Sequence, residues 1–291
     1  VDADMDLLIM GLFGPKLHQL DTTAEAKLGE PPTIELAMAL DVTGSMNSNG
    51  KLPALKKASQ DLLDALFEYE SADVKVGVVP FAQYVNVGDN HAAAGWLKPP
   101  GGAWNGCVGS RPYPWNVRDD DYGTTKAPGL NVAGCPPQLL PMTDDQDDIA
   151  DMIKGLKASG STYVPAGLSW AWALLTPEQP FAEGVPFEDL PKVNGIKALM
   201  VMTDGENTRS PDYPGHEVKS AGTANALTKE ICENIKKQEI VVYAVAFEVT
   251  NTTIMDILRG CATDASYFFD AKDGKALSAA FNSIAASLRN I

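Results

Sequence analysis

Oxygen-bearing side chains follow the first strongly apolar stretch of the chain. Residues 39–46 read ALDVTGSM, so Asp41, Thr43 and Ser45 occupy alternate positions where the apolar run ends. A second apolar run, much later in the chain, ends at Asp204. A polar turn explains one such cluster, because Asp, Thr, Gly and Ser are common turn residues. Two runs that both end in aspartate favour a site, because neighbouring carboxylates raise each other's pKa or bind a cation.

Thr162 completes the candidate donor set. It lies in the segment GSTYVPAGL, which leads into a predicted helix at 163–175. Hydroxyls combined with two carboxylates give an all-oxygen donor set of low formal charge, which suits a hard divalent ion. We therefore expect a site for Mg²⁺, or for another hard divalent ion such as Ca²⁺ or Mn²⁺. Its five predicted ligands are Asp41, Thr43, Ser45, Thr162 and Asp204.

The elements that must position these residues alternate between strands and helices. Apolar runs predict strands at 33–40, 74–82, 84–89, 196–205, 240–249 and 266–271. Helical spacing of apolar residues predicts helices at 51–70, 143–159, 163–175, 226–238 and 253–261, and a last helix carrying Leu277, Phe281, Ile284 and Leu288. This alternation predicts an α/β fold with a doubly wound, mostly parallel open sheet. Ligands of such sheets bind beyond the carboxyl ends of the strands.

Two local features of this sheet are also expected. The tightly joined runs 74–82 and 84–89 favour an antiparallel pair at one edge of the sheet. Thr143 and Gln146 match a capping box at the start of a helix, and the aspartates around Gln146 suit the positive end of that helix. A calcium loop is the less favoured interpretation of these aspartates, because the glycine turn of an EF-hand loop is missing.

The chain divides into a short N-terminal segment and one long domain. Residues 1–32 end in Gly-Glu-Pro-Pro and begin at Val1 without a Met. We interpret them as a segment that follows a removed membrane or pilin-like anchor. Residues 33–291 form the domain, and residues 90–142 form an irregular insertion within it. The insertion holds eight of the 20 prolines and three of the five tryptophans, and insertions of this length are usually functional or cross-linked.

The charge balance argues against two classes of partner. With 38 acidic and 23 basic residues, the formal net charge is −15 at pH 7, so nucleic acid and an anionic membrane surface are not expected as partners. The charge fits a cation binder, or simply a soluble surface. No apolar run approaches the roughly 20 residues that span a bilayer. We expect the protein to contact a membrane only through a segment that is not present in this chain.

The four cysteines suggest an oxidising compartment. Cys107 and Cys135 lie in the insertion, whereas Cys232 and Cys261 fall on predicted helices that flank the strand at 240–249. No Cys-x-x-Cys and no nearby histidine supports a zinc site. Four cysteines allow three pairings, and we expect the local one, Cys107–Cys135 and Cys232–Cys261. The alternative is four reduced, buried cysteines.

The motif DVTGS resembles the Asp-x-Ser-x-Ser motif of von Willebrand factor A domains, with Thr43 in place of the first serine. In that family a metal-ion-dependent adhesion site is completed by a threonine from a later loop and an aspartate after the fourth strand. The segments GSTYVPAGL and MTDGEN supply these residues as Thr162 and Asp204. The resemblance implies an ion with an open position, which the carboxylate of a partner's Asp or Glu fills.

A narrower resemblance is to the TadG-like proteins of bacterial tight-adherence (Tad/Flp) pili. It rests on LDVTGSM, TYVPAGLSWAWALLTP, KEICENIKKQEIVVYAVAF and CATDASYFFDAKDGKALSAAFNSIAASL. This resemblance implies an extracytoplasmic domain, anchored at the inner membrane in the periplasm or carried on a pilus at the cell surface. Pilus subunits or a surface ligand are then the expected protein partners, in pilus assembly or in adhesion at the pilus tip.

Enzymatic activity is not expected. The chain carries no Gly-x-Ser-x-Gly, His-Glu-x-x-His, phosphate loop or Gly-x-Gly-x-x-Gly motif. His18, His91 and His216 lie outside every motif, although His216 follows Asp204 closely enough to approach the same edge. A metal-dependent hydrolase is one alternative, with Glu206 as the candidate acid or base. A subunit of an intracellular chelatase or ATPase assembly is another, and the cysteines argue against it.

Overall fold

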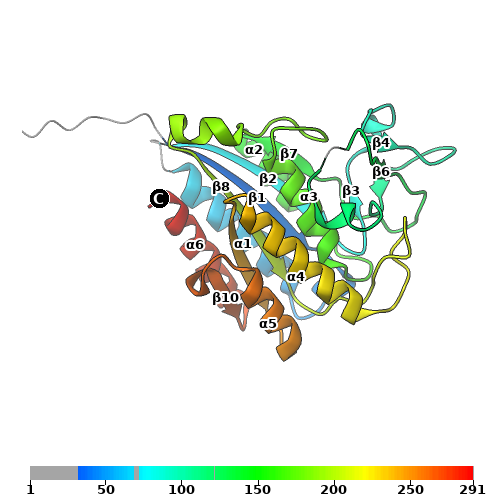
Figure 1. The fold of residues 1–291 in the computed structure, drawn as a ribbon. Coiled ribbons are helices and arrows are strands. Elements are labelled where there is room, and N and C mark those ends of the chain that lie inside the picture. Colours follow the sequence, from blue (N-terminus) through cyan, green and yellow to red (C-terminus); the bar gives the residue numbers. More distant parts are fainter. Residues whose placement is uncertain (1–31, 69–71, 121, 291) are drawn as a thin grey trace, which may run out of the picture. The chain divides into compact units, whose positions relative to one another are not determined.

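A six-stranded sheet forms the centre of the computed structural model, which describes residues 32–68, 72–120 and 122–290. The strand order is β10-β9-β8-β1-β2-β7 (Figure 1), and every neighbouring pair is parallel except β2 and β7. The expected doubly wound, mostly parallel sheet is confirmed. Its strands are β1 (Thr33–Asp41), β2 (Asp73–Phe81), β7 (Leu140–Thr143), β8 (Ile196–Thr203), β9 (Val241–Phe247) and β10 (Phe268–Ala271). The expected N-terminal segment, residues 1–32, lies outside the described residues apart from Pro32.

Helices cover both faces of this sheet (Figure 1). One face packs against α1 (Lys51–Phe67), α2 (Gln146–Gly155) and α6 (Gly274–Arg289). The other face packs against α3 (Val164–Leu175), α4 (Ala221–Lys237) and α5 (Thr252–Cys261). None of the helices in the described part of the chain is long and apolar enough to cross a membrane.

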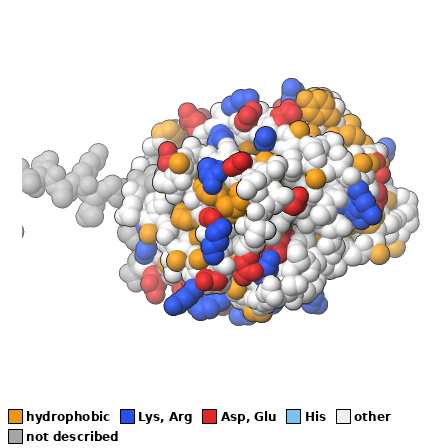
Figure 2. Space-filling view, turned by 90° about the horizontal axis from the view of Figure 1, so that it is seen from below, with side chains coloured by type: hydrophobic (Ala, Val, Ile, Leu, Met, Phe, Trp, Pro, Cys, Tyr) orange, Lys and Arg blue, Asp and Glu red, His pale blue; other side chains and the backbone are white. Residues whose placement is uncertain are grey.

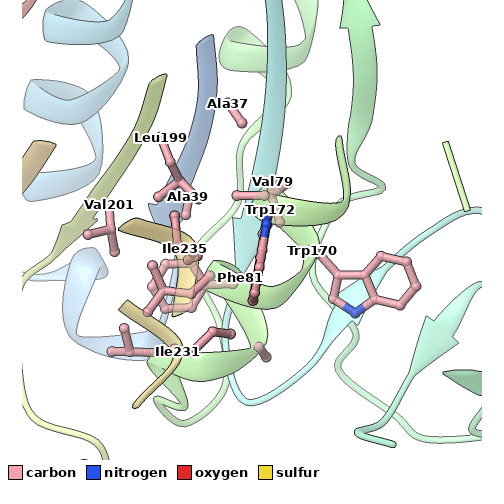
Figure 3. Packing of buried hydrophobic residues seen from close by; sticks show 14 of the residues in the cluster. Ala37, Ala39, Val79, Phe81, Trp170, Trp172, Leu199, Val201, Ile231 and Ile235 are labelled. Carbon is pink, nitrogen blue, oxygen red and sulfur yellow. The ribbon is translucent and has the colours of Figure 1, made fainter. Parts of the chain in front are cut away.

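The central strand β1 is buried along its whole length. Leu36, Met38 and Leu40 face α1 and α6, whereas Ala37 and Ala39 face the α3 side. The side chains of β1 on the α3 side are small, and Trp172 from α3 belongs to the cluster on that side (Figure 3). Trp170 points away from the sheet, and its ring lies near those of Trp96 and Phe181. Burial on both faces explains why this strand reads as an unbroken apolar run in the sequence. It also fixes Asp41 at the carboxyl end of a rigid element.

The predicted antiparallel pair of 74–82 with 84–89 is wrong. The second segment contributes β3 (Val85–Asn86), which pairs with β5 (Cys107–Val108) in a small separate sheet. The antiparallel neighbour of β2 is β7, from the end of the predicted insertion. The Cys107–Cys135 disulfide joins β5 to a later part of the insertion, and this cross-linked unit offers β3 a partner away from the main sheet.

The insertion is largely irregular, as expected, but it is held by specific contacts. A second small sheet pairs β4 (Leu97–Lys98) with β6 (Ala127–Pro128), and Figure 1 shows these strands beyond the edge of the main sheet. Both predicted disulfides are confirmed: Cys107–Cys135 lies in the insertion, and Cys232–Cys261 joins α4 to α5. The insertion ends earlier than predicted, because regular structure resumes with β7.

The predicted capping box at Thr143 is also wrong. The residue that caps α2 is Asp145, whose side chain accepts hydrogen bonds from the backbone N–H groups of Asp147 and Asp148. The Thr143 hydroxyl instead accepts one from the backbone of Asp145. A carboxylate two positions further on is closer to the unpaired N–H groups of the first turn, so it replaces the threonine as the cap.

Candidate metal centre

Asp41 lies at the carboxyl end of β1 and is completely buried. Its Oδ1 accepts a hydrogen bond from the backbone N–H of Thr43 at 2.8 Å. Its Oδ2 accepts one from the hydroxyl of Thr203, the last residue of the neighbouring strand β8, at 2.6 Å. The strand and these two donors fix the carboxylate in one orientation. A fixed, buried carboxylate is well suited to act as a ligand, because little order is lost when a cation binds.

Asp204 follows β8, and Thr43 and Ser45 link it to the first strand. The hydroxyl of Ser45 donates to Asp204 Oδ1 at 2.7 Å and lies 2.9 Å from the hydroxyl of Thr43. Thr43 precedes the short 3₁₀ helix η2 (Gly44–Asn47), which carries Ser45. Thr43 is buried and Ser45 is exposed, so the set opens to solvent on the Ser45 side. The structure therefore brings four of the five predicted ligands together: Asp41, Thr43, Ser45 and Asp204.

Thr162 lies in a loop that is tied to the same edge of the sheet. The backbone N–H of Gly44 donates to the carbonyl of Gly160 at 2.9 Å. The carbonyl of Thr162 accepts from the backbone N–H groups of Thr208 and Arg209, in the loop that follows Asp204. These bonds place Thr162 beside both strand ends, but its hydroxyl forms none of the hydrogen bonds that join the other four residues. Its role as a ligand stays a prediction.

The electrostatics of the site favour a cation. Burial, and then the negative charge of Asp204, raise the pKa of Asp41 to about 6, while the hydrogen bonds from Thr203 and Thr43 act in the opposite direction. A buried carboxylate beside a second one favours a positive charge nearby. Two carboxylates and neutral hydroxyls match the oxygen ligands of magnesium, which usually keeps several waters. The residues present therefore fit a divalent ion of this kind.

This centre is poor in charged ligands. Within the described residues, no group of three or more His, Cys, Asp or Glu side chains is placed to hold a metal ion. Hydroxyls would therefore have to supply the remaining protein ligands of any ion bound here. An ion held by two carboxylates and neutral oxygens keeps more positive charge than one held by three carboxylates, and it can attract an anionic oxygen from another molecule.

Two charged residues at this edge were not predicted from the sequence. Lys51 Nζ lies 3.0 Å from Asp204 Oδ2 and 3.8 Å from Glu248 Oε2. Glu248 directly follows β9, the strand next to β8, so three adjacent strands each end in a carboxylate. Two sequence signals were available. Lys51 begins a helix whose first turn holds no acidic residue, and Glu248 directly follows the strand β9. Neither signal gives the order of strands in the sheet.

His216 and Glu206, which the sequence placed near this edge, have other hydrogen-bond partners. His216 is buried rather than exposed, and its ring contacts Ser110 and the carbonyl of Gln83. Burial lowers the pKa of His216 to about 4, which keeps the ring neutral at pH 7. Glu206 is exposed and accepts a hydrogen bond from Asn251. Neither side chain contacts the four residues brought together at the strand ends.

A groove of about 590 Å³ lies in the insertion. Lys98, Lys126 and Tyr213 line it together with several prolines. Tyr213 comes from the loop after β8, the same loop that begins with Asp204. On the face drawn in Figure 2, acidic and basic side chains are interspersed rather than gathered into one basic patch.

Comparison with solved structures identifies the fold. The pilus adhesin SpaC from Lactobacillus rhamnosus GG aligns with 90% of this chain at 14% identity and a TM-score of 0.57. The vWF domain of the type V pili tip protein Mfa5 from Porphyromonas gingivalis aligns with 91% of this chain and 97% of its own length, at 11% identity and a TM-score of 0.57. The chain has a von Willebrand factor A-like fold.

A third similar structure is the PilB minor pilin from Streptococcus sanguinis, at 14% identity and a TM-score of 0.51 over 91% of this chain. This chain spans about a third of the length of SpaC, since the alignment covers 31% of that protein. No protein-family model and no curated protein matches this chain. At these identities the comparisons establish the fold, and function has to be argued from the site.

Proposed function

We propose that this chain is a metal-dependent protein-binding module of a bacterial pilus. The observation that carries this proposal is the convergence of Asp41, Thr43, Ser45 and Asp204, from two strands far apart in the sequence, at one solvent-open edge of the sheet. The module would take part in adhesion at the pilus tip or in assembly of a Tad-type pilus. It is proposed to bind its partner without catalysing a reaction.

Five residues would hold the ion: Asp41, Thr43, Ser45, Thr162 and Asp204. Bound Mg²⁺ would supply a Lewis-acidic position for an oxygen of the partner, and Ca²⁺ or Mn²⁺ are the alternative ions. Within the chain, Asp41 is held by Thr203 and by the backbone of Thr43, so its carboxylate is oriented before any ligand arrives. An Asp or Glu of the partner protein is the ligand that suits the open position.

Two observations support a location outside the cytoplasm, which fits the same proposal. The chain shares its fold with a pilus adhesin, a pilus tip protein and a minor pilin. Its four cysteines form two disulfides, which is typical of proteins in oxidising compartments. A periplasmic, inner-membrane-anchored or cell-surface location is therefore proposed, and the resemblance to TadG-like proteins points to a Tad pilus in particular.

The experiment compares Mg²⁺ binding and partner binding in the wild-type chain and in Ser45→Ala. Calorimetric titration should detect Mg²⁺ binding to the wild type and little or none to Ser45→Ala, because a ligand hydroxyl is lost. Ser48→Ala, an exposed serine just after η2, is the matched control and should bind Mg²⁺ as the wild type does. Thermal unfolding in EDTA should be unchanged in Ser48→Ala. It should be only modestly lowered in Ser45→Ala, which loses its hydrogen bond to Asp204 but remains folded.

Partner binding is then tested with pilin subunits immobilised on beads. Capture of the wild-type chain should require Mg²⁺, disappear in EDTA and disappear in Ser45→Ala. Capture that survives EDTA unchanged would rule out a metal-mediated contact. The groove lined by Lys98, Lys126 and Tyr213 would then be the better candidate for the binding surface.

A further inference from the structure

Lys51 is placed against the electrostatic preference of its own helix. It is the first residue of α1, where the partial positive charge of the helix N-terminus disfavours a cation. Its side chain is nevertheless folded inward and only 11% exposed. Its ammonium must be stabilised by the carboxylates that it contacts. The side chain also lies 6.0 Å from the centre of the Phe247 ring.

Both oxygens of Asp204 are engaged. Oδ1 accepts from the hydroxyl of Ser45 at 2.7 Å, and Oδ2 accepts from Lys51 Nζ at 3.0 Å. The Asp204 side chain is fully buried, so its contact with Lys51 is screened less by water and salt than a surface ion pair would be. Any cation that uses Asp204 as a ligand must meet the positive charge of Lys51 at the same carboxylate.

Glu248 offers the ammonium a second position. Its Oε2 lies 3.8 Å from Lys51 Nζ, and its side chain is 25% exposed. The backbone of Glu248 is in the left-handed region, with φ of 53°, and its N–H donates to the carbonyl of Ala271 in β10 at 2.7 Å. The glutamate is thus held beside the lysine by the sheet rather than by the metal centre.

We propose that Lys51 is a built-in counter-cation that sets the metal affinity of this site. Without metal, Lys51 neutralises Asp204. When a divalent ion binds, Lys51 gives up Asp204 and pairs with Glu248. This inference rests on the proposed function, because it concerns the affinity of the same metal centre. It makes Lys51 and Glu248 residues that tune the site without being ligands.

The first test is calorimetric titration of the full chain with Mg²⁺. Lys51→Met and Lys51→Gln should bind Mg²⁺ roughly tenfold more tightly than the wild type, within the usual range for coupling between two binding events. Lys57→Met is the matched control, since it removes one positive charge from the same helix at a side chain that is 70% exposed. It should leave the dissociation constant within about twofold, because exposed charges are screened.

The second test is a double-mutant cycle with Glu248→Gln. Glu248→Gln alone should weaken Mg²⁺ binding, because the ammonium loses the position to which it moves. In the Lys51→Met background the same change should have a much smaller effect. An equal effect in both backgrounds would show that Glu248 acts through its own charge and would overturn the proposed transfer. Circular dichroism in EDTA identifies any variant that fails to fold, and Lys51→Gln, which keeps a donor toward Asp204, then replaces Lys51→Met.

The outcomes separate this inference from the proposed function. If the wild type binds Mg²⁺ and Ser45→Ala does not, but Lys51→Met binds no more tightly than Lys57→Met, the role of Lys51 is refuted and the metal centre stands. If neither the wild type nor the Lys51 variants bind Mg²⁺, the metal centre itself is refuted, and this inference with it.

Discussion

Asp41→Asn should stabilise the metal-free protein at neutral pH while abolishing its metal binding. The carboxylate of Asp41 is fully buried and lies near that of Asp204. An asparagine keeps an oxygen for the backbone N–H of Thr43 and presents an amide toward the hydroxyl of Thr203, so both hydrogen bonds can be kept. The substitution removes the charge from the site and leaves its shape nearly unchanged.

The magnitude follows from the pKa of Asp41, which is raised from 3.8 to about 6. Below pH 3.8 the carboxyl is protonated in both the folded and the unfolded chain. As the pH rises through 6, the folded chain must ionise a buried carboxyl that ionises more easily when unfolded, so stability is lost. This rise in the pKa of Asp41 corresponds to about 3 kcal/mol of lost stability at pH 7.5. The asparagine of the Asp41→Asn variant does not titrate, so the variant lacks this dependence.

The measurement is urea denaturation in EDTA from pH 4 to pH 7.5, comparing the variant with the wild type at each pH. The difference has to be used, because other groups titrate in the same range. The pKa of His216 is lowered to about 4, so its contribution to stability is lost as the pH falls below 6.5, opposite in sign to that of Asp41. The advantage of Asp41→Asn should grow by about 3 kcal/mol toward pH 7.5. A difference that does not change with pH would refute the buried charge, and undiminished Mg²⁺ binding by the variant would refute the ligand assignment.

Two further predictions concern stability away from the metal centre. Replacing Cys232 and Cys261 by serine opens a cross-link between residues 29 positions apart, which should cost about 3–4 kcal/mol in the chain-entropy model; a loss below about 1 kcal/mol in urea denaturation would contradict it. Lys197→Met should cost about 3–5 kcal/mol, because it leaves the fully buried carboxylate of Glu35 unpaired. The double variant Lys197→Met with Glu35→Gln keeps an acceptor for the backbone N–H of Val185, so it should recover much of the lost stability. If it recovers none, the loss comes from packing and not from the ion pair.

The sequence predicted the elements that have a clear period or an unbroken apolar run. Strand β1 and helix α3 were expected at nearly their observed bounds, because burial on both faces leaves an apolar signature that local context does not disturb. The partner of β3 was predicted incorrectly, since a strand of two residues carries no periodicity. Its actual partner is β5, which lies about twenty residues further along the chain and carries Cys107 of the Cys107–Cys135 disulfide. The local disulfide pairing was predictable for two reasons. Cys232 and Cys261 lie on helices that flank the same strand, and Cys107 and Cys135 lie in the same irregular insertion.

Some residues of the candidate site were predicted from the sequence, and others were missed. Asp41, Thr43 and Ser45 were predictable because they lie close together in the sequence, and Asp204 because it ends a strong strand. Lys51 was missed because its contact with Asp204 joins residues that lie 153 positions apart in the sequence. Glu248 was missed for a different reason. It becomes a neighbour of Asp204 only when β9 lies beside β8, and the sequence does not state that order.

The charges at this edge give a physical reason for a partner to depend on metal. Asp41, Asp204 and Glu248 together with Lys51 carry a formal charge of two negative units without metal, so a carboxylate from another protein is repelled at contact. A divalent ion cancels that charge and offers the carboxylate a direct bond. The acidic surface of the chain, with its net charge of −15, acts over longer distances but is largely screened beyond about 10 Å at ordinary salt. The ion would therefore convert a repulsive edge into one that accepts an acidic partner, and complementarity of this kind decides which partner binds.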